Sequence, residues 1–501
     1  MQQNRPAGYA FLLEKYKLDA IPNWHSSRIA PTGTRSEIIQ DGLVETTYPR
    51  SYWPGERDGN HLEFALKYDG INLATLALIF EVIDAASLRD WIASKPTGKY
   101  ARKIWFLYEF LTGRQLLLAD LTQGNYIYLL ESNKYYSARW SSGQEIVQRQ
   151  RIYNNLPCSP EFCPIVRRTE KLAEMERIDI TQRCEEIVTA YPPELLKRAL
   201  SYLYRKETKA SFEIEHIKPD SSRTDRFIAL LTTAEHRDFC EKEQLIEIQN
   251  SIVDSRFCDS DYRQNQNYVG ETVTPLQEKI HYITPKPEDL TGLMNGLIST
   301  HRKLKQERNM PVVVHAAIIA YGFVFLHPFE DGNGRIHRFL IHNILAQRRV
   351  VPEGLMFPVS AAMFNNPILY DRSLEAFSVP LLKLVDYELD DSGDMTVSGQ
   401  TGIWYRYIDM TAQVEALYEF VIKTIDEELK KELDFLVGYD RTKKALQEIV
   451  DMPDRQIDLF IRLCLQNNGH LSTTKRESHF GMLTDDEIER MEAVVRTNYA
   501  S

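Results

Sequence analysis

The segment from His327 to Arg338 gathers several chemical groups within a short stretch of chain. His327 precedes a proline, and its imidazole is the side chain that can take up a proton near neutral pH. Asp331 supplies a hard carboxylate oxygen of the kind that Mg²⁺ prefers. Arg335 and Arg338 are forked cations at helical spacing. A base, a metal ligand and two cations this close together predict transfer of a phosphate-containing group to a hydroxyl.

A buried helix, a loop and a second helix must position these groups. Val312 to Leu326 is apolar on nearly every side, which predicts a central helix that ends before Pro328. Glycines flank Asn333, and we expect positive φ angles there that turn backbone N–H groups into one hollow. The N-terminus of the following helix adds partial positive charge at the same place. His337 lies between the arginines and is interpreted as a structural residue.

The same segment resembles the motif of Fic (Fido) proteins position for position, and the resemblance extends over residues 165–385. It implies a helical core and transfer of AMP from ATP, with Mg²⁺, to Ser, Thr or Tyr hydroxyls of proteins, this chain included. The intact glycines differ from the Doc-type branch, whose altered loop implies kinase chemistry. The implied roles are a base at His327, a metal ligand at Asp331, an α-phosphate loop at Gly332, Asn333 and Gly334, and β- and γ-phosphate clamps at Arg335 and Arg338.

An upstream segment is similar to the inhibitory helix of the family, Ser/Thr-x-x-x-Glu-Gly/Asn. Ser211 and Glu215 match this pattern, whereas His216 replaces the usual Gly or Asn. A carboxylate paired with Arg338 would occupy the cation meant for the γ-phosphate. We therefore expect Glu215 to restrain the enzyme. A weaker match, Thr473 to Glu477, is followed by Ser478.

Two further features carry over from the resemblance. Tyr370 lies where relatives have a Tyr-rich helix near the adenosine, although an aromatic on a core helix is as readily explained by packing. Ser378 stands where relatives often have Asn. Residues 267–283 are expected to form the hairpin, or flap, that aligns a target segment by strand addition.

The predicted fold class is mainly α. We expect a helical Fic core with a small β-hairpin flap, an N-terminal α+β domain and a C-terminal helical domain. The last domain could contain a helix-turn-helix, but an ordinary helical bundle is favoured because turn spacing is weakly specific. The expected boundaries are 1–164 for the N-terminal domain, 165–385 for the Fic domain, 386–403 for a linker and 404–501 for the C-terminal domain.

Composition restricts the function classes. The 501 residues carry a net charge of −11, which argues against general binding to nucleic-acid phosphates. There is no apolar run long enough for a membrane span and no secretory signal. Sparse cysteines fit the cytoplasm, and we expect the close pair Cys158 and Cys163 to be free thiols.

Three alternatives remain open. The same site could carry UMP, phosphocholine or another phosphate-containing group, or could remove AMP, since the inhibitory glutamate supports removal in some relatives. The chain could instead be a regulator that binds DNA through its C-terminal helices and senses nucleotide with the Fic core. The intact His327 disfavours this role, because sensing alone needs no base. Relatives often dimerise, so a homodimer is also implied.

Overall fold

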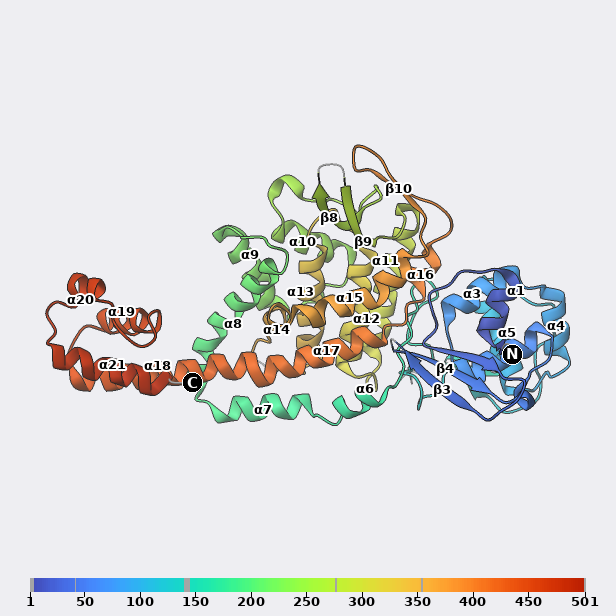
Figure 1. The fold of residues 1–501 in the computed structure, drawn as a ribbon, viewed down its shortest axis with the longest axis horizontal. Coiled ribbons are helices and arrows are strands. Elements are labelled where there is room, and N and C mark those ends of the chain that lie inside the picture. Colours follow the sequence, from blue (N-terminus) through green and yellow to red (C-terminus); the bar gives the residue numbers. More distant parts are fainter. Residues whose placement is uncertain (1–3, 41, 139–144, 275–276, 353–354, 500–501) are drawn as a thin grey trace. The chain divides into compact units, whose positions relative to one another are not determined.

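The computed structural model describes residues 4–40, 42–138, 145–274, 277–352 and 355–499 (Figure 1). Contacts divide the chain into two compact units, each made of separate stretches of sequence. The first unit contains Met1–Ile178, Pro219–Arg348 and Asn366–Glu419, and the second contains Asp179–Lys218, Arg349–Asn365 and Phe420–Ser501. The three domains and the linker predicted above stay a prediction. Within the described residues no helix is both long enough and apolar enough to cross a membrane.

The N-terminal part of the first unit mixes helices with two small sheets, as predicted. One sheet has the strand order β1-β2-β4-β3, and the other has the order β5-β7-β6. In the first sheet β2 runs parallel to β4, and the other two pairings are antiparallel. The elements are β1 (Arg5–Ala7), α1 (Tyr9–Tyr16), β2 (His25–Ile29), β3 (Ser36–Gln40), β4 (Leu43–Tyr48), α2 (Asp58–Phe64), a π-helical turn (Ala65–Asp69), α3 (Leu73–Val82), α4 (Ala85–Ala93), α5 (Lys99–Thr112), β5 (Ile127–Tyr128), β6 (Glu145–Val147) and β7 (Ile152–Asn154).

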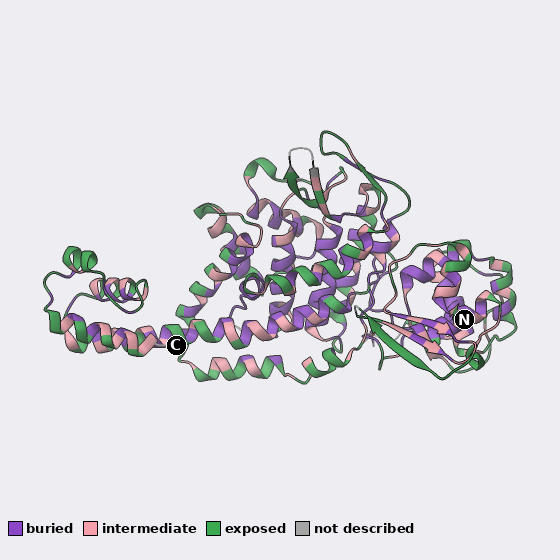
Figure 2. Ribbon diagram, in the orientation of Figure 1, coloured by how far each residue is buried: buried purple, intermediate pink, exposed green. Residues whose placement is uncertain are grey.

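The rest of the first unit is mainly helical and surrounds α12 (Val312–Leu326). Every residue of α12 from Val313 to Leu326 is buried, as Figure 2 shows, because this helix has no polar face to turn outward. It packs against α11 and α13. The other elements are α6 (Glu170–Met175), α9 (Ser221–Thr233), α10 (Lys242–Ile252), β8 (Tyr268–Thr274), β9 (Gln277–Ile283), α11 (Pro287–Gln306), α13 (Asn333–Gln347), α15 (Pro367–Leu382), β10 (Tyr387–Leu389), β11 (Met395–Val397) and α16 (Gly402–Arg406), with α17 (Thr411–Lys423) crossing into the second unit.

A loop of the N-terminal part inserts into this helical core. Phe162 is fully buried, and its ring lies where a Cβ on Gly322 of α12 would come within 2.6 Å of it. The backbone at Phe162 also lies against Gly296 of α11, where a Cβ would be 2.7 Å from the nitrogen. Gly296 and Gly322 therefore leave a slot for Phe162 between their helices, and any larger side chain at either position would collide with the loop.

The prediction of free thiols at the ends of this loop is wrong. Cys158 and Cys163 are joined by a disulfide, with their Cα atoms 4.8 Å apart. The loop folds back on itself because Phe162 N donates to the Ser159 carbonyl. Ser159 Oγ donates to the Gly296 carbonyl and so holds the loop against α11. Sequence spacing alone did not reveal that this turn brings the two sulfur atoms together.

The second unit is helical, and ion pairs join its helices. Arg183 lies 2.8 Å from Asp426, and Arg198 lies 2.8 Å from Asp440. A buried carboxylate, Glu207 of α8, accepts from the backbone nitrogen of Ser360 at 2.8 Å. The elements are α7 (Ile180–Ala190), α8 (Pro193–Glu213), α14 (Val359–Asn365), a π-helical turn (Thr424–Leu429), α18 (Lys430–Ile449), α19 (Asp454–Leu465), α20 (Thr473–His479) and α21 (Asp485–Tyr499).

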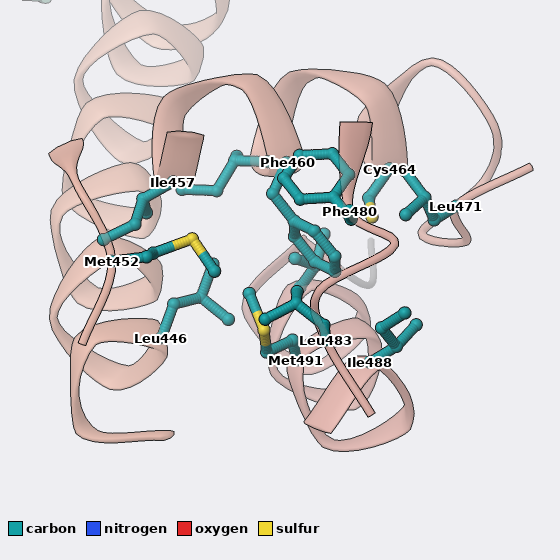
Figure 3. Close-up of a cluster of buried hydrophobic side chains, with 12 residues drawn as sticks. Leu446, Met452, Ile457, Phe460, Cys464, Leu471, Phe480, Leu483, Ile488 and Met491 are labelled. Carbon is teal, nitrogen blue, oxygen red and sulfur yellow. The ribbon is translucent and has the colours of Figure 1, made fainter. Parts of the chain in front are cut away.

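The last helices of this unit share a core of their own (Figure 3). Phe460 of α19 packs edge-on against Phe480, with ring centroids 5.3 Å apart. Met491 of α21 is fully buried in the same cluster. The predicted helical C-terminal region is thus present, and it buries its apolar face within itself.

Two helical stretches of the chain are each divided into two helices. Asp179 begins α7 as a helix separate from α6, because its side chain accepts from the backbone nitrogen of Gln182. The second stretch is divided into α9 and α10, whereas α18 continues without a break from Lys430 to Ile449.

The predicted linker 386–403 contains a short hairpin, β10–β11. The turn between the two strands consists of the acidic residues 390–394. Asp390 Oδ1 stabilises it by accepting from the backbone nitrogens of Ser392 and Asp394, at 2.8 and 2.9 Å. Such self-bonding is what makes Asp favourable in turns. The predicted hairpin at 267–283 is confirmed as β8–β9, with positions 275–276 outside the described residues.

The slot at Gly322 makes Phe162 a strong test of the packing. We expect Phe162→Ala to lower the free energy of unfolding by about 3–5 kcal/mol, since it leaves a cavity beside α12. Leu117→Ala, at a side chain that is 87% exposed, should change it by less than about 0.5 kcal/mol. Urea denaturation of both variants measures the difference. Equal effects would show that the loop does not stabilise the core.

Candidate active site

The site begins where α12 ends. His327 has φ 50° and ψ 58°, a left-handed conformation, directly after the last helical residue, Leu326. Its backbone nitrogen still donates to the Phe323 carbonyl, at 2.9 Å. Pro328 disfavours the right-handed helical conformation for the residue before it, so the helix stops there as predicted.

The imidazole of His327 is held in a defined orientation. Its Nδ1 lies 3.2 Å from the carbonyl oxygen of Val324, one turn back in α12. A carbonyl only accepts hydrogen bonds, so Nδ1 carries the proton and Nε2 keeps its lone pair. Burial lowers the pKa of His327 to about 4. The ring is therefore neutral at pH 7 and presents Nε2 as a proton acceptor.

The loop after His327 is held by Asn333. The side chain of Asn333 accepts from the backbone nitrogen of Phe329 at 3.1 Å and donates to the carbonyl of the same residue at 2.7 Å. Gly332 has φ 92°, a conformation that favours glycine. A Cβ there would also meet Val253 Cγ1 at 3.2 Å. The predicted positive φ is therefore present at Gly332.

The expectation that both glycines give the loop positive φ angles is corrected at Gly334. This glycine is the second residue of α13, which begins at Asn333, so its backbone is helical. The amide of Asn333 is engaged with Phe329, so its side chain shapes the loop. Backbone N–H groups in the first turn of α13 remain the predicted anion donors, since the first turn of a helix has no internal acceptors for them.

The predicted metal ligand and one predicted phosphate clamp contact each other. Arg335 Nη2 donates to Asp331 Oδ1 at 2.6 Å, and Arg335 Nη1 donates to the carbonyl of Ile252 at 3.0 Å. Arg335 is fully buried, whereas the Asp331 side chain is 47% exposed. An exposed carboxylate fits Mg²⁺, which in phosphate sites uses one or two carboxylates with phosphate oxygens and water as its other ligands. Within the described residues no group of three acidic, His or Cys side chains could hold a metal by itself.

Arg338, the second predicted clamp, lies beside Tyr370. Arg338 Nη1 donates to Tyr370 Oη at 3.3 Å, and both side chains are buried. Tyr370 Oη is also 3.4 Å from His337 Nδ1. His337 packs against Tyr321, with ring centroids 4.7 Å apart. The structure thus brings Tyr370 to Arg338, while its predicted contact with an adenosine ring stays a prediction. Ser378 is buried on the same helix, α15.

Two residues near the site were not singled out from the sequence. Asp259 Oδ2 accepts from the backbone nitrogen of Glu330 at 3.3 Å and from Gln249 Nε2 at 3.0 Å. Burial, together with the nearby charge of Asp331, raises the pKa of Asp259. The second is Arg263, whose Nε donates to the His327 carbonyl at 2.9 Å. Both lie in the irregular stretch before β8, where the sequence has no periodicity that could have revealed them.

The predicted inhibitory residues lie at the end of α8, in the second compact unit. Ser211 is buried in the helix, and Glu215 is half-buried just after it. His216 has φ 57°. Its backbone nitrogen donates to the Glu213 carbonyl at 2.9 Å, and that of Ile217 donates to the Phe212 carbonyl at 3.1 Å. This is a Schellman ending, in which the left-handed position is usually Gly or Asn. His216, which replaces the Gly or Asn of the family pattern, therefore occupies a position where the left-handed backbone conformation favours those two residues.

Comparison with known proteins finds a family model that is similar to the region of the site. The model of the Fic/DOC family matches residues 239–345, which contain α10 to α12, most of α13, the β8–β9 hairpin and the whole His327–Arg338 segment. The similarity to the Fic/DOC family is thus confined to this part of the chain.

Curated relatives match over a limited region. "Protein adenylyltransferase Fic" of Aedes aegypti is 30% identical over 123 residues, which are 24% of this chain and 22% of that protein. The protein of the same name from Drosophila melanogaster is 35% identical over 94 residues, 18% of this chain and 16% of that protein. The chain thus matches about a fifth of the length of these relatives.

Solved structures of Fic proteins are similar at lower identity. A Fic family protein from Desulfovibrio desulfuricans G20 has a TM-score of 0.38 at 17% identity, and the match covers 66% of this chain and 88% of that one. A Fic domain containing signaling protein from Bacteroides thetaiotaomicron VPI-5482 has a TM-score of 0.37 at 17% identity, covering 52% of this chain and 97% of that one.

The backbone of Gly332 gives a prediction with a matched control. Gly332→Ala forces a side chain into a left-handed conformation and against Val253, so it should destabilise the fold by about 1–2 kcal/mol. Gly292→Ala lies within α11 with open space around its Cβ, and should stabilise by about 0.5–1 kcal/mol. Urea denaturation should give opposite signs. A stabilising Gly332→Ala would contradict the loop conformation described here.

The ending of α8 gives a second prediction. His216→Gly should raise the free energy of unfolding by about 1 kcal/mol, because glycine adopts the left-handed position without the Cβ penalty. His236→Gly, at an exposed residue outside the group with positive φ, should give no such gain. Thermal unfolding of the two variants measures this, and a loss of stability in His216→Gly would exclude the Schellman ending.

Proposed function

We propose that this protein transfers AMP from ATP to a Ser, Thr or Tyr hydroxyl of a protein. The observation that carries the proposal is the orientation of His327, whose neutral ring presents Nε2 at the end of α12. The N-terminus of α13 and the buried Arg335 follow it within the same segment. The match of this region to the Fic/DOC family and the names of the relatives support the same chemistry.

In the proposed reaction, His327 Nε2 takes the proton of the target hydroxyl. The hydroxyl oxygen forms a bond to the α-phosphorus of ATP, the bond from that phosphorus to the α,β-bridging oxygen breaks, and pyrophosphate leaves. Backbone N–H groups of Gly332, Asn333 and Gly334 would stabilise the charge on the α-phosphate. Arg335 and Arg338 would hold the β- and γ-phosphates.

Mg²⁺ fits the exposed carboxylate of Asp331, and when bound there it would supply positive charge against the phosphate oxygens. Arg335 is the side chain that Asp331 contacts in the structure. With ATP and Mg²⁺ bound, Arg335 would bond phosphate and Asp331 would bond Mg²⁺. Each side chain would thus exchange its present partner for a new one.

The pKa of His327 also suits this role. A pKa of about 4 leaves the base unprotonated at neutral pH. Negative phosphates close to an imidazole stabilise its charged form, so bound ATP would raise this pKa toward the working pH. The base would thus become stronger when the substrate is present.

We further propose that Glu215 restrains the enzyme by pairing with Arg338. The match to the inhibitory pattern at Ser211 and Glu215 supports this, and the Schellman ending of α8 accounts for the one departure, His216. Because Arg338 is also the proposed γ-phosphate clamp, a pair with Glu215 would leave ATP in a non-productive position.

Labelling with ATP tests both proposals. With α-labelled ATP and Mg²⁺, the wild type should label itself weakly, Glu215→Gly should label about tenfold more strongly or better, and His327→Ala should give no label. The proposed mechanism would be wrong if His327→Ala kept its label.

Two controls sharpen this experiment. Glu213→Gly alters the same helix end at a side chain that pairs with Lys209, and it should label like the wild type. If it labels as strongly as Glu215→Gly, loosening of the helix and not loss of the Glu215 carboxylate explains the gain. γ-Labelled ATP should give no incorporation, and label from it would identify a kinase. UTP in place of ATP tests the other cargo.

A further inference from the structure

Because α12 ends at Leu326, the carbonyl groups of the residues that follow it have no partner within a helix. Three successive ones, at His327, Pro328 and Phe329, accept hydrogen bonds from the segment that leads into β8. Arg263 Nε donates to His327 at 2.9 Å and the Arg263 backbone nitrogen donates to Pro328 at 2.8 Å. Asn267 Nδ2 lies 3.4 Å from the Phe329 carbonyl. The start of the site and the base of the β8–β9 hairpin are therefore bonded side by side.

Arg263 uses all three guanidinium nitrogens on backbone carbonyls. Besides the bond to His327, Nη1 donates to Asn265 at 2.7 Å, and Nη2 donates to Pro285 at 2.6 Å. Asn265 lies before β8 and Pro285 lies after β9, so one side chain joins both ends of the hairpin to the catalytic histidine. Arg263 is only 4% exposed, which makes these bonds costly to lose.

Other contacts attach the hairpin to the same helix end. Tyr282 of β9 donates its hydroxyl proton to the carbonyl of Phe325, two residues before His327. Thr284 Oγ1 donates to the carbonyl of Asn267 at 2.6 Å, which closes the base of the hairpin. In this set of hydrogen bonds, Arg263 contributes the charged side chain, and it bonds to His327 as well as to both ends of the hairpin.

We propose that Arg263 is a positioning residue that holds the general base and the target-binding hairpin in one fixed arrangement. The roles of His327 and of the hairpin rest on the proposed function, whereas the hydrogen bonds that join them through Arg263 are a property of the fold. A target segment added to the hairpin would be placed against His327 Nε2 through this arginine, so that a shift of the hairpin would also shift the base.

Arg263 affects His327 by charge as well as by position. Burial is the largest cause of the lowered pKa of His327, the guanidinium of Arg263 lowers this pKa further, and the carboxylate of Asp331 raises it. Burial lowers the pKa of Arg263 to about 10, so it stays charged at neutral pH. Charge and hydrogen bonding can therefore be separated by choice of substitution.

The experiment compares Arg263→Lys with Arg263→Gln. Lysine keeps the charge but cannot make the three forked bonds, and glutamine loses both. We expect both to lower kcat for AMP transfer on the order of 10²-fold. The KM for ATP should change little, because Arg335 and Arg338, and not Arg263, are the proposed phosphate clamps. NMR titration should show a raised pKa for His327 in Arg263→Gln alone. Arg256→Gln, at an exposed arginine in the same stretch, is the control and should match the wild type.

Hydrogen exchange gives a readout that needs no activity. Amides of the hairpin should exchange faster in Arg263→Lys while those of α11 and α12 keep their protection. Hairpin protection equal to the wild type, or wild-type kcat in Arg263→Lys, would overturn the proposal. If Arg263→Gln does not fold, Arg263→Lys decides by these same two measurements. If the wild type transfers no AMP, the proposed function fails, while the exchange and the titration still test the coupling.

Discussion

The candidate site depends on how α12 stops. Pro328 excludes one more turn of right-handed helix at His327, and the left-handed residue that results turns the chain away from the helix axis. The same turn gives the imidazole its bond to Val324 and leaves the final carbonyls exposed to other donors. A buried apolar helix supplies the rigidity, because its position is fixed by packing on every side. The proposed base, His327, thus directly follows a helix whose residues from Val313 to Leu326 are all buried.

The charged side chains near the end of α12 each have a hydrogen-bond partner in the structure. Asp331 bonds Arg335, Arg338 bonds Tyr370, and the guanidinium of Arg263 bonds only carbonyl groups in the contacts described. Buried cations of this kind are costly unless each donor is satisfied. In the proposed reaction, phosphate oxygens would replace the present partners of Arg335 and Arg338. The same property would make Arg338 sensitive to any competing carboxylate, which is the basis proposed for restraint by Glu215.

Much of this arrangement could be predicted from the sequence. The central helix, its end at His327, the hairpin near 267–283 and the mainly helical fold follow from apolar periodicity and from proline and glycine placement. Local patterns could not reveal bonds between distant segments. Arg263 and Asp259 lie in an irregular stretch and matter only because folding brings it to the motif. The disulfide of Cys158 and Cys163 likewise depends on a loop inserted between glycines of two helices. Gly334 shows the opposite failure, since a glycine that suggests a turn lies in a helix.

The proposed chemistry requires that the fold present His327 Nε2 as a neutral proton acceptor. ¹⁵N NMR of the imidazole across a pH titration measures this state, because the two ring nitrogens shift differently when one of them carries the proton. We expect a proton on Nδ1 and none on Nε2 at neutral pH, with protonation of Nε2 only near pH 4. A proton on Nε2 at neutral pH, or titration at the ordinary histidine value of about 6.5, would contradict it.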